Sequence, residues 1–542
     1  MAAVDLETGI RHDGTSTMGA DPIDEEKTTL KNSIEDGNDT VTTSTASSEI
    51  VEFRAAEQAT GTYNESDSKL VSWSGPDDPE NPLNFPVWKK WAITICMASV
   101  TLVVTFASSV FSTATLVTAE EFNVSAEVMI LGTSLFVLGF AFGPLVWAPL
   151  SELFGRKTPL LAGYFVFAVF QIPVAVSQNI YTIMIFRFFG GLFGSTPFGV
   201  VGGAMVDIWV PLDRGIAMSL FGGATFIGPV AGPIVGGFIV DSYLGWHWTA
   251  WITLIMAAFF GSIAFFVLPE THAPTLLKRR AQKLRLATRD WALHSALEEQ
   301  PVDINTLVFL YLLRPWKMLF LEPILLLITI YMAFVYGIIY LLFEAYPISF
   351  QQGRGWSSGV GALPFLAITV GVVGGVSLVV YISKTRYARI IKETGRLQPE
   401  ERLIPMMVGA VLFPAGLFWF AWTSDPHISW VPQVLSGILI GAGVMSIFLQ
   451  GLNYIIDCFL MNSNSALAAN GLLRAACGAG FPLFATAMYD RLGVEWATSL
   501  LGFIAVALIP VPVLFYIFGP RLRKMSRFSP KFPPRPPPVA SS

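Results

Sequence analysis

The chain contains 542 residues, of which 53% are hydrophobic and only 13% are charged, and its formal net charge is −5. This composition is far from that of a soluble globular domain. The acidic residues concentrate near the N-terminus, so the net charge says little about partners, and nothing in it supports nucleic-acid binding. The 5 histidines are scattered, without the H-x-x-x-H or H-E-x-x-H spacing of a metal site inside a membrane. We therefore expect no metal, no cofactor and no enzymatic activity.

The N-terminal segment, 1–88, is predicted to be a disordered cytoplasmic tail, because Ser, Thr, Asp and Glu dominate most of it. A proline-rich lead-in at 77–86 then delivers Trp88 and Lys89 to a membrane interface, where Trp and Lys anchor helix ends.

Long uncharged stretches follow in regular succession. Each holds about twenty apolar residues, enough to cross the hydrocarbon layer as a helix, and lipid cannot satisfy the exposed backbone groups of other structures. We expect an all-α integral membrane protein with twelve transmembrane helices in two six-helix halves. The spans are predicted at about 91–115, 128–149, 158–177, 181–206, 215–240, 248–268, 319–345, 358–382, 403–423, 430–456, 465–488 and 496–519.

These spans divide the chain into parts. A first bundle at 89–269 and a second at 318–520 flank a cytoplasmic central loop at 270–317, and a cytoplasmic tail occupies 521–542. Basic clusters fall at every second break between spans, as at 156–157 and 521–524. Cytoplasmic loops retain Lys and Arg, so both termini are expected in the cytoplasm. We expect a multi-pass protein of the plasma membrane, or alternatively the vacuolar membrane, that functions as a monomer.

The two halves echo each other. Pro233 precedes Asp241 by the same interval as Pro482 precedes Asp490. Many transporters build a site between such duplicated units.

Three motifs resemble those of one family. The segment 149–157, PLSELFGRK, resembles the inner-loop signature of the major facilitator superfamily, with Glu152 in place of the usual Asp. Arg187 with Gly191 resembles its intramembrane arginine motif. A set in the fifth span resembles the antiporter motif of its exporter branches: Gly215, Gly228, Pro229, Gly232 and Pro233. With Pro269-Glu270-Thr271 and the lead-in, the chain looks most like the fungal twelve-span drug:proton antiporters. This implies export of small compounds in exchange for protons.

Two charged residues are candidates for proton coupling. A charge in mid-membrane is costly, about 3 kcal/mol on lenient scales, so Arg187 should face protein or water, or snorkel partly to the outer end of its span. The resemblance implies a part for it in proton coupling or substrate binding. Glu344 is a carboxyl in an apolar context and the candidate proton carrier; the alternative places it, ionised, among outer headgroups.

A charge network is expected at the inner ends of the spans, and it would hold that side shut. Asp207 and Asp457 end the fourth and tenth spans, with partners expected from Arg156 and Lys157 or from Lys384 and Arg386. The proposed network contains Glu152, Arg156, Lys157, Asp207 and Asp457. The alternative is simple solvation at the interface.

Polar stripes with helical spacing predict the substrate cavity, because lipid penalises such faces. They lie on the first, seventh and tenth spans and include Thr105, Ser108, Ser112, Tyr336, Tyr340, Ser446, Gln450 and Asn453. Hydrogen bonding between helices is the alternative. Arg474 in the eleventh span is expected to pair with Asp457 or to contact an anionic substrate, and Asn123 fits a glycosylation pattern on an outer loop.

The expected function is proton-driven export of small amphipathic or hydrophobic compounds, such as drugs, toxins or fungal secondary metabolites. The alternative is a proton-coupled transporter of organic acids, polyamines or nutrients in the same superfamily. The expected partners are the lipid bilayer, the small-molecule substrate and protons.

Overall fold

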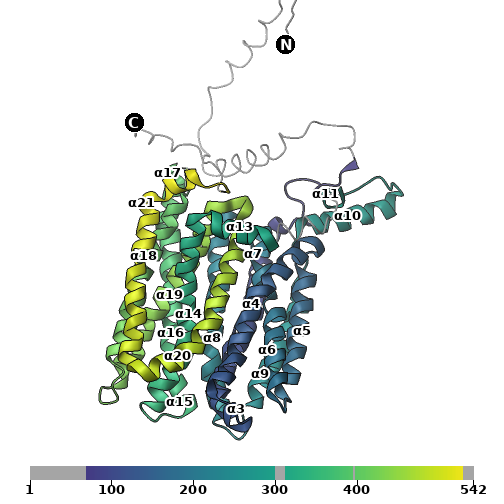
Figure 1. The fold of residues 1–542 in the computed structure, drawn as a ribbon. Helices are drawn as coiled ribbons and strands as arrows, with labels where there is room; N and C mark the ends of the chain where they lie inside the picture. The colour runs from purple at the N-terminus through teal and green to yellow at the C-terminus, as the bar shows by residue number, and fades with distance from the viewer. Residues whose placement is uncertain (1–68, 300–311, 395–396, 529–542) are drawn as a thin grey trace, which may run out of the picture. The chain divides into compact units, whose positions relative to one another are not determined.

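The computed structural model describes residues 69–299, 312–394 and 397–528. These described residues form one compact unit. The described part is helical, apart from one isolated bridge between Leu70 and His294. The helices of the first half are α2 Val87–Val110, α3 Thr115–Glu121, α4 Ala126–Phe154, α5 Lys157–Ala175, α6 Ile180–Gly194, α7 Thr196–Ile208, α8 Pro211–Val240 and α9 His247–Val267 (Figure 1). The connection carries α10 Ala273–Thr288 and α11 Ala296–Glu299.

The second half continues the same pattern. Its helices are α13 Arg314–Leu321, α14 Pro323–Tyr346, α15 Ser358–Ala362, α16 Phe365–Ile382, α17 Ala388–Thr394, α18 Leu403–Trp422, α19 Trp430–Phe459, α20 Ser463–Leu508 and α21 Pro510–Met525. Eleven helical segments of the described residues are long and apolar enough to cross a membrane. The last spans 63 residues, but Gly493 inside it has φ 74° and ψ 167°. A helix cannot continue through that conformation, so the segment is two crossings, and the twelve-helix fold is confirmed.

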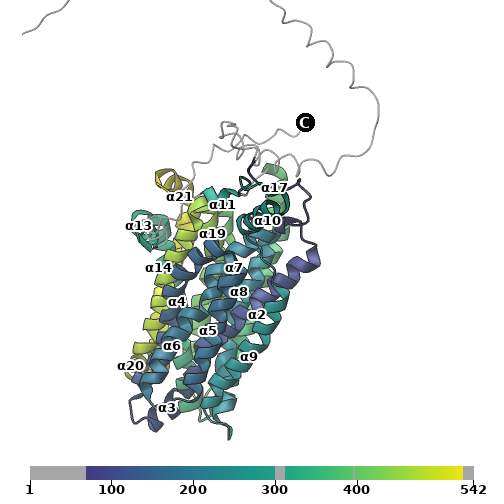
Figure 2. The same cartoon turned by 90° about the vertical axis from the view of Figure 1, so that its right-hand side faces the viewer.

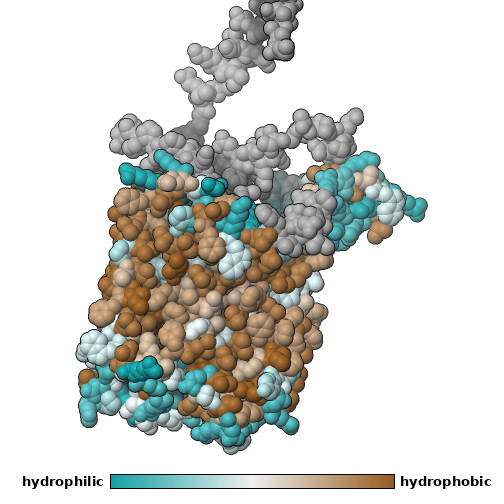
Figure 3. All heavy atoms as spheres, viewed as in Figure 1, coloured by the Kyte–Doolittle hydropathy of each residue, from teal (hydrophilic) through white to brown (hydrophobic). Residues whose placement is uncertain are grey.

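The surface of the bundle fits a bilayer. A hydrophobic belt separates two hydrophilic ends (Figure 3). One end carries α10, α13 and α17 and is here called the basic end; the other carries α3 and α15 and is called the opposite end (Figure 1).

Two large buried clusters form the core. One joins residues between Ile93 and Leu268 with Ala475, and the other joins residues between Met318 and Phe515 with three from the first half. Within the first half, α5 packs along α9 (Figure 2), while α20 packs on α4 and α8 packs on α15 and α16 across the halves. The centre of the protein is therefore the seam between two packed bundles.

The segment before the first span differs from the prediction of a tail disordered through residue 88. Residues 1–68 lie outside the described part, but from Lys69 onward the chain is held by contacts. The Val71 amide donates to the His294 carbonyl at 2.8 Å, and Arg280 of α10 forms an ion pair with Asp78 at 2.6 Å. The predicted C-terminal tail also begins later than expected, because α21 continues to Met525.

Candidate functional site

The two halves meet at the centre through aromatic and hydroxyl side chains. The Ser108 hydroxyl of α2 hydrogen-bonds to the Tyr340 hydroxyl of α14 at 2.9 Å, and the Tyr336 hydroxyl donates to that of Tyr340 at 3.4 Å. Nearby, the ring centroids of Phe226 in α8 and Phe448 in α19 are 4.9 Å apart. Helices from both halves thus converge on one polar–aromatic cluster.

Arg474 of α20 adds a positive charge to this cluster. Its guanidinium carbon lies 5.2 Å from the Tyr336 ring centroid and 5.6 Å from that of Phe448, within the range of a cation–π interaction. Among the described residues, no hydrogen bond or ion pair engages this guanidinium, and the side chain is half-buried. Of the two partners that the sequence suggested for Arg474, Asp457 is not the one, because it pairs with Arg402; contact with an anionic substrate stays a prediction.

Arg187 is held entirely inside the first half. The residue is only 3% exposed, and its guanidinium donates to the carbonyls of Ala107 at 2.8 Å, Gly132 at 2.9 Å and Ser108 at 3.3 Å. The rings of Phe111 and Phe136 lie at 5.0 and 4.5 Å. Arg187 does not snorkel; carbonyl dipoles replace water around its charge, and they tie α6 to α2 and α4.

Glu344 lies on α14 about one turn beyond Tyr340. It is half-buried, and the described residues offer its carboxylate no hydrogen bond or ion pair. No hydrogen bond or ion pair joins Glu344 to Arg187, both described residues, and the role of Glu344 as proton carrier stays a prediction.

At the basic end, the loop between α4 and α5 is held by two carboxylates. Arg156 Nε pairs with Asp207 Oδ2 at 3.0 Å, as the sequence predicted for this pair. The Glu270 carboxylate accepts from the amides of Arg156 at 2.7 Å and His272 at 3.0 Å. The tight turn requires Gly155, whose φ of +88° is in the left-handed region and whose missing Cβ leaves room for Glu270.

Sequence reasoning quoted Glu270 only as part of a motif and gave it no role. The backbone amide of Lys157 donates to Glu270 Oε2 at 3.4 Å, but its Nζ donates to the Phe265 carbonyl at 3.2 Å rather than to a carboxylate.

The second half carries an equivalent pair with a partner that the sequence did not predict. Asp457 Oδ2 accepts from Arg402 Nε at 3.0 Å, whereas Arg386 pairs with Glu401 at 3.0 Å. Neither Lys384 nor Arg386 is the partner, because Arg402 stands at the start of α18, directly beside the end of α19. The sequence signal for a pair here was the equivalent position of Asp207 and Asp457, at the ends of the fourth and tenth spans.

Each arginine–aspartate pair lies within its own half: Arg156–Asp207 in the first and Arg402–Asp457 in the second. A hydrogen bond joins the halves at this end, from Asn464 Nδ2 to Glu152 Oε1 at 3.0 Å. At the opposite end, Asp241 Oδ2 accepts from the Gly359 amide at 2.7 Å.

The antiporter-motif glycines form a smooth face of α8 against α2. A Cβ on Gly228 would lie 2.0 Å from Thr105 Oγ1, and one on Gly232 would lie 2.1 Å from Ser109 Oγ. Pro229 and Pro233 lie inside the same helix. A Cβ added to Gly215 would meet no atom of another element within 4 Å. Close backbone packing thus accounts for two of the three glycines of the motif.

The predicted polar stripes do not all face the centre. Thr105 donates toward the Ala224 carbonyl of α8 at 3.4 Å. Ser446 of α19 packs against α18, because a Cβ added to Gly409 of α18 would lie 2.8 Å from Ser446 Cβ. Asp457, also on this stripe, pairs with the first turn of α18. Gln450 and Asn453 lie between them at helical spacing, on the face toward α18.

Two further predicted site residues lie near the opposite end. Ser112 is half-buried in the turn Phe111–Ala114. Asn123 is exposed, with φ 49°, between α3 and α4.

Comparison with known proteins identifies the family to which this fold belongs. A family model described as Major Facilitator Superfamily matches residues 97–459. The chain is 57% identical to a citrinin biosynthesis cluster MFS transporter of Monascus ruber, over 86% of this chain and 93% of the relative. It is 48% identical to the cercosporin MFS transporter of Cercospora nicotianae, over 86% and 91%. The solved proton:xylose symporter XylE shares the fold with a TM-score of 0.57 at 16% identity, over 80% of this chain and 96% of that chain. The chain belongs to the major facilitator superfamily.

Proposed function

We propose that the protein exports small amphipathic compounds, in particular fungal secondary metabolites, in exchange for protons. The observation that carries this proposal is the free Arg474 guanidinium between two aromatic rings at the seam of the halves. The Tyr336 and Phe448 rings offer apolar faces, and the guanidinium offers N–H donors in a fixed fork. A ligand with a flat apolar body and carbonyl, phenolate or carboxylate oxygens fits this combination. Two relatives are named for metabolites, citrinin and cercosporin, which supports the same class.

Proton exchange requires a carrier linked to the ligand site. We assign Glu344 as the carrier and Arg187 as the coupling residue. Arg187 donates to the Ser108 carbonyl, the Ser108 hydroxyl bonds to Tyr340, and Glu344 follows Tyr340 by one helical turn. A change of charge at Glu344 would therefore be felt at the tyrosines that contact the ligand.

We propose alternating access that uses two hydrogen bonds between the halves, one at each end. The Asp241–Gly359 bond closes the opposite end, and the Asn464–Glu152 bond closes the basic end. We propose that Arg156 and Arg402, through their aspartates, brace each half while these contacts break and form. Proton and substrate would each shift the equilibrium only by their differential affinity for the two states.

The positive-inside rule supports a topology with the basic end and both termini in the cytoplasm. We place the protein in the plasma membrane as a monomer, with the vacuolar membrane as the alternative. Epitope tags at Ala2 and Ser542 that reacted on opposite faces of sealed vesicles would exclude this topology.

The test is transport in sealed vesicles containing the purified protein. Movement across the vesicle membrane is measured for a panel of aromatic compounds under an imposed pH gradient and under the reversed gradient. The panel contains compounds with and without an acidic oxygen, and it includes citrinin and cercosporin. We expect movement against the proton flux, and none without a gradient. Absence of gradient-driven movement for every compound would refute the proposal.

A variant pair tests the site itself. Hydrogen bonds to a charged group contribute about 1.5–3 kcal/mol, so Arg474→Gln should weaken transport of the acidic compounds by roughly tenfold or more. Arg491→Gln, an exposed arginine of the same helix, is the matched control and should transport normally. Equal behaviour of the two variants would remove Arg474 from the site.

Organic-acid transport is the second candidate, and the same free guanidinium favours it. A polyamine is a less suitable substrate, because its positive charges would be repelled by the guanidinium groups of Arg187 and Arg474. Movement of the acids together with protons, rather than against them, would select this alternative.

A further inference from the structure

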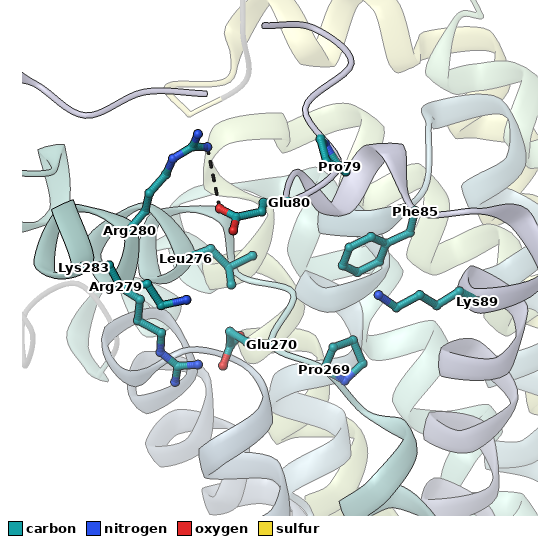
Figure 4. A pocket seen from close by; sticks show the side chains of 10 residues that line it. All are labelled: Pro79, Glu80, Phe85, Lys89, Pro269, Glu270, Leu276, Arg279, Arg280 and Lys283. Atoms are coloured by element: carbon teal, nitrogen blue, oxygen red, sulfur yellow. Dashed lines mark ion pairs between the residues drawn. The ribbon is translucent and has the colours of Figure 1, made fainter. Parts of the chain in front are cut away.

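A cavity of about 380 Å³ lies at the basic end, away from the central site. Its walls come from the lead-in and the start of α2 on one side, and from α10 and the residues before it on the other (Figure 4). Phe85, Pro269 and Leu276 supply apolar surface. Segments distant in the sequence, 79–89 and 269–283, thus build one site.

The lining has an excess of positive charge. Four cations, Lys89, Arg279, Arg280 and Lys283, face two carboxylates, Glu80 and Glu270. Figure 4 shows Lys89 opposite the cations that α10 contributes.

Backbone amides engage Glu270, and Glu80 lies beside Arg280 within the cavity. Glu270 accepts hydrogen bonds from the amides of Arg156, Thr271 and His272. Glu80 lies 3.7 Å from Arg280, and Arg280 is neutralised mainly by Asp78.

Three cations remain without a carboxylate among the described residues: Lys89, Arg279 and Lys283. Lys89 Nζ lies 3.6 Å from the Phe85 ring centroid, which holds its charge at the cavity. Unpaired cations around a cavity with apolar walls are complementary to an anion that carries an apolar body.

The position of the cavity indicates which kind of anion would reach it. Trp88, next to Lys89, is 73% exposed, and Phe266, near Pro269, is 83% exposed. Exposed aromatic side chains beside Lys and Arg mark the level of lipid headgroups. The cavity therefore lies where phospholipid phosphates lie.

We propose that this cavity binds the phosphate-bearing headgroup of an anionic phospholipid. Lys89 holds the phosphate from α2, and Arg279 and Lys283 hold it from α10. Bound lipid links the lead-in and α10 to the first bundle. Glu270, in the cavity wall, also fixes the loop that carries Arg156, so the site adjoins the charge network. A soluble phosphate ester shares the headgroup chemistry.

The experiment measures binding of full-length protein in nanodiscs. Discs of phosphatidylcholine alone are titrated with phosphatidylglycerol carrying a fluorescent chain, and sn-glycerol 3-phosphate is the soluble competitor. Each cation near an anionic surface contributes roughly a fivefold gain in affinity. The triple variant Lys89→Gln/Arg279→Gln/Lys283→Gln should therefore bind on the order of a hundredfold more weakly.

The matched control removes the same charge elsewhere at the basic end. Arg289, Lys384 and Lys392 are exposed and lie outside the cavity lining, so Arg289→Gln/Lys384→Gln/Lys392→Gln should bind like the unmodified protein. Equal losses in the two triples, or saturable binding that neither changes, would overturn the site. Full competition by glycerol phosphate at the lipid's own concentration would show that the site takes soluble phosphate esters instead of lipid. If the site triple loses secondary structure by circular dichroism, the single variant Lys89→Gln, expected to lose about fivefold, decides the question.

Discussion

Substitution of Gly228 by alanine tests whether the antiporter motif works through close packing. The added Cβ would lie 2.0 Å from Thr105 Oγ1, 2.7 Å from the Leu102 carbonyl oxygen and 2.9 Å from the Phe106 amide nitrogen. The hydroxyl can rotate away, but the other two atoms are backbone, so α2 and α8 must separate. Overpacking of this kind costs about 1–3 kcal/mol, which exceeds the gain of about 1 kcal/mol from replacing a helical glycine.

Gly215→Ala is the matched control on the same helix. No atom lies within 4 Å of its added Cβ, so only the propensity gain applies, and the two variants should differ by about 2 kcal/mol. Thermal melts of the detergent-solubilised protein at one scan rate measure the difference. Thr105→Ala added to Gly228→Ala should recover only part of the loss, because the backbone contacts remain. Superimposable melts of Gly228→Ala and Gly215→Ala would refute the packing argument.

Three further predictions follow from the site. Arg187→Ala removes the donor to three carbonyls in α2 and α4, so gradient-driven export should be lost while the protein stays in the membrane fraction. Normal export would end its coupling role. Asn464→Ala breaks the bond to Glu152, so cysteine-accessibility measurements should report more of the state open at the basic end, and an unchanged pattern would contradict this gate. Burial and the nearby Arg156 guanidinium lower the pKa of His272 from 6.5 to about 4. As the pH is lowered, the imidazole of His272 takes up a proton in the unfolded chain before it does so in the folded protein. The free energy of unfolding should therefore decrease as the pH is lowered from about 6.5 to about 4. His272→Gln should flatten this part of the melting-temperature profile, and an unchanged slope would show that another group titrates.

The sequence alone predicted the fold because a bilayer makes the relevant signal local. A run of about twenty apolar residues is a helix whatever surrounds it, so the spans could be placed without tertiary information. The predicted break between the spans at 465–488 and 496–519 contains Gly493, whose non-helical φ and ψ separate the last two crossings. The Arg156–Asp207 pair was predictable as well, because Arg156 precedes α5 and Asp207 lies in the last turn of α7, at the same end of the bundle.

The spacing of polar residues along a helix did not reveal which neighbouring helix the polar face packs against. The stripe through Ser446 and Asp457 was correctly set apart from lipid, yet it faces α18, because the rotation of α19 is set by glycine contacts such as Gly443 against Phe413. Periodicity identifies a polar face but contains no information on the partner. For the same reason the partner of Asp457 could not be chosen between basic residues at the same end.

The sequence by itself thus determined the crossings, the two halves and the cost of burying Arg187, since these depend on transfer of each segment from water to lipid. Only the tertiary structure decided that Arg474 stays unpaired between Tyr336 and Phe448, and that residues 69–86 pack on α10. Those outcomes depend on distances between segments hundreds of residues apart, and they are fixed by how the two bundles pack rather than by any local pattern.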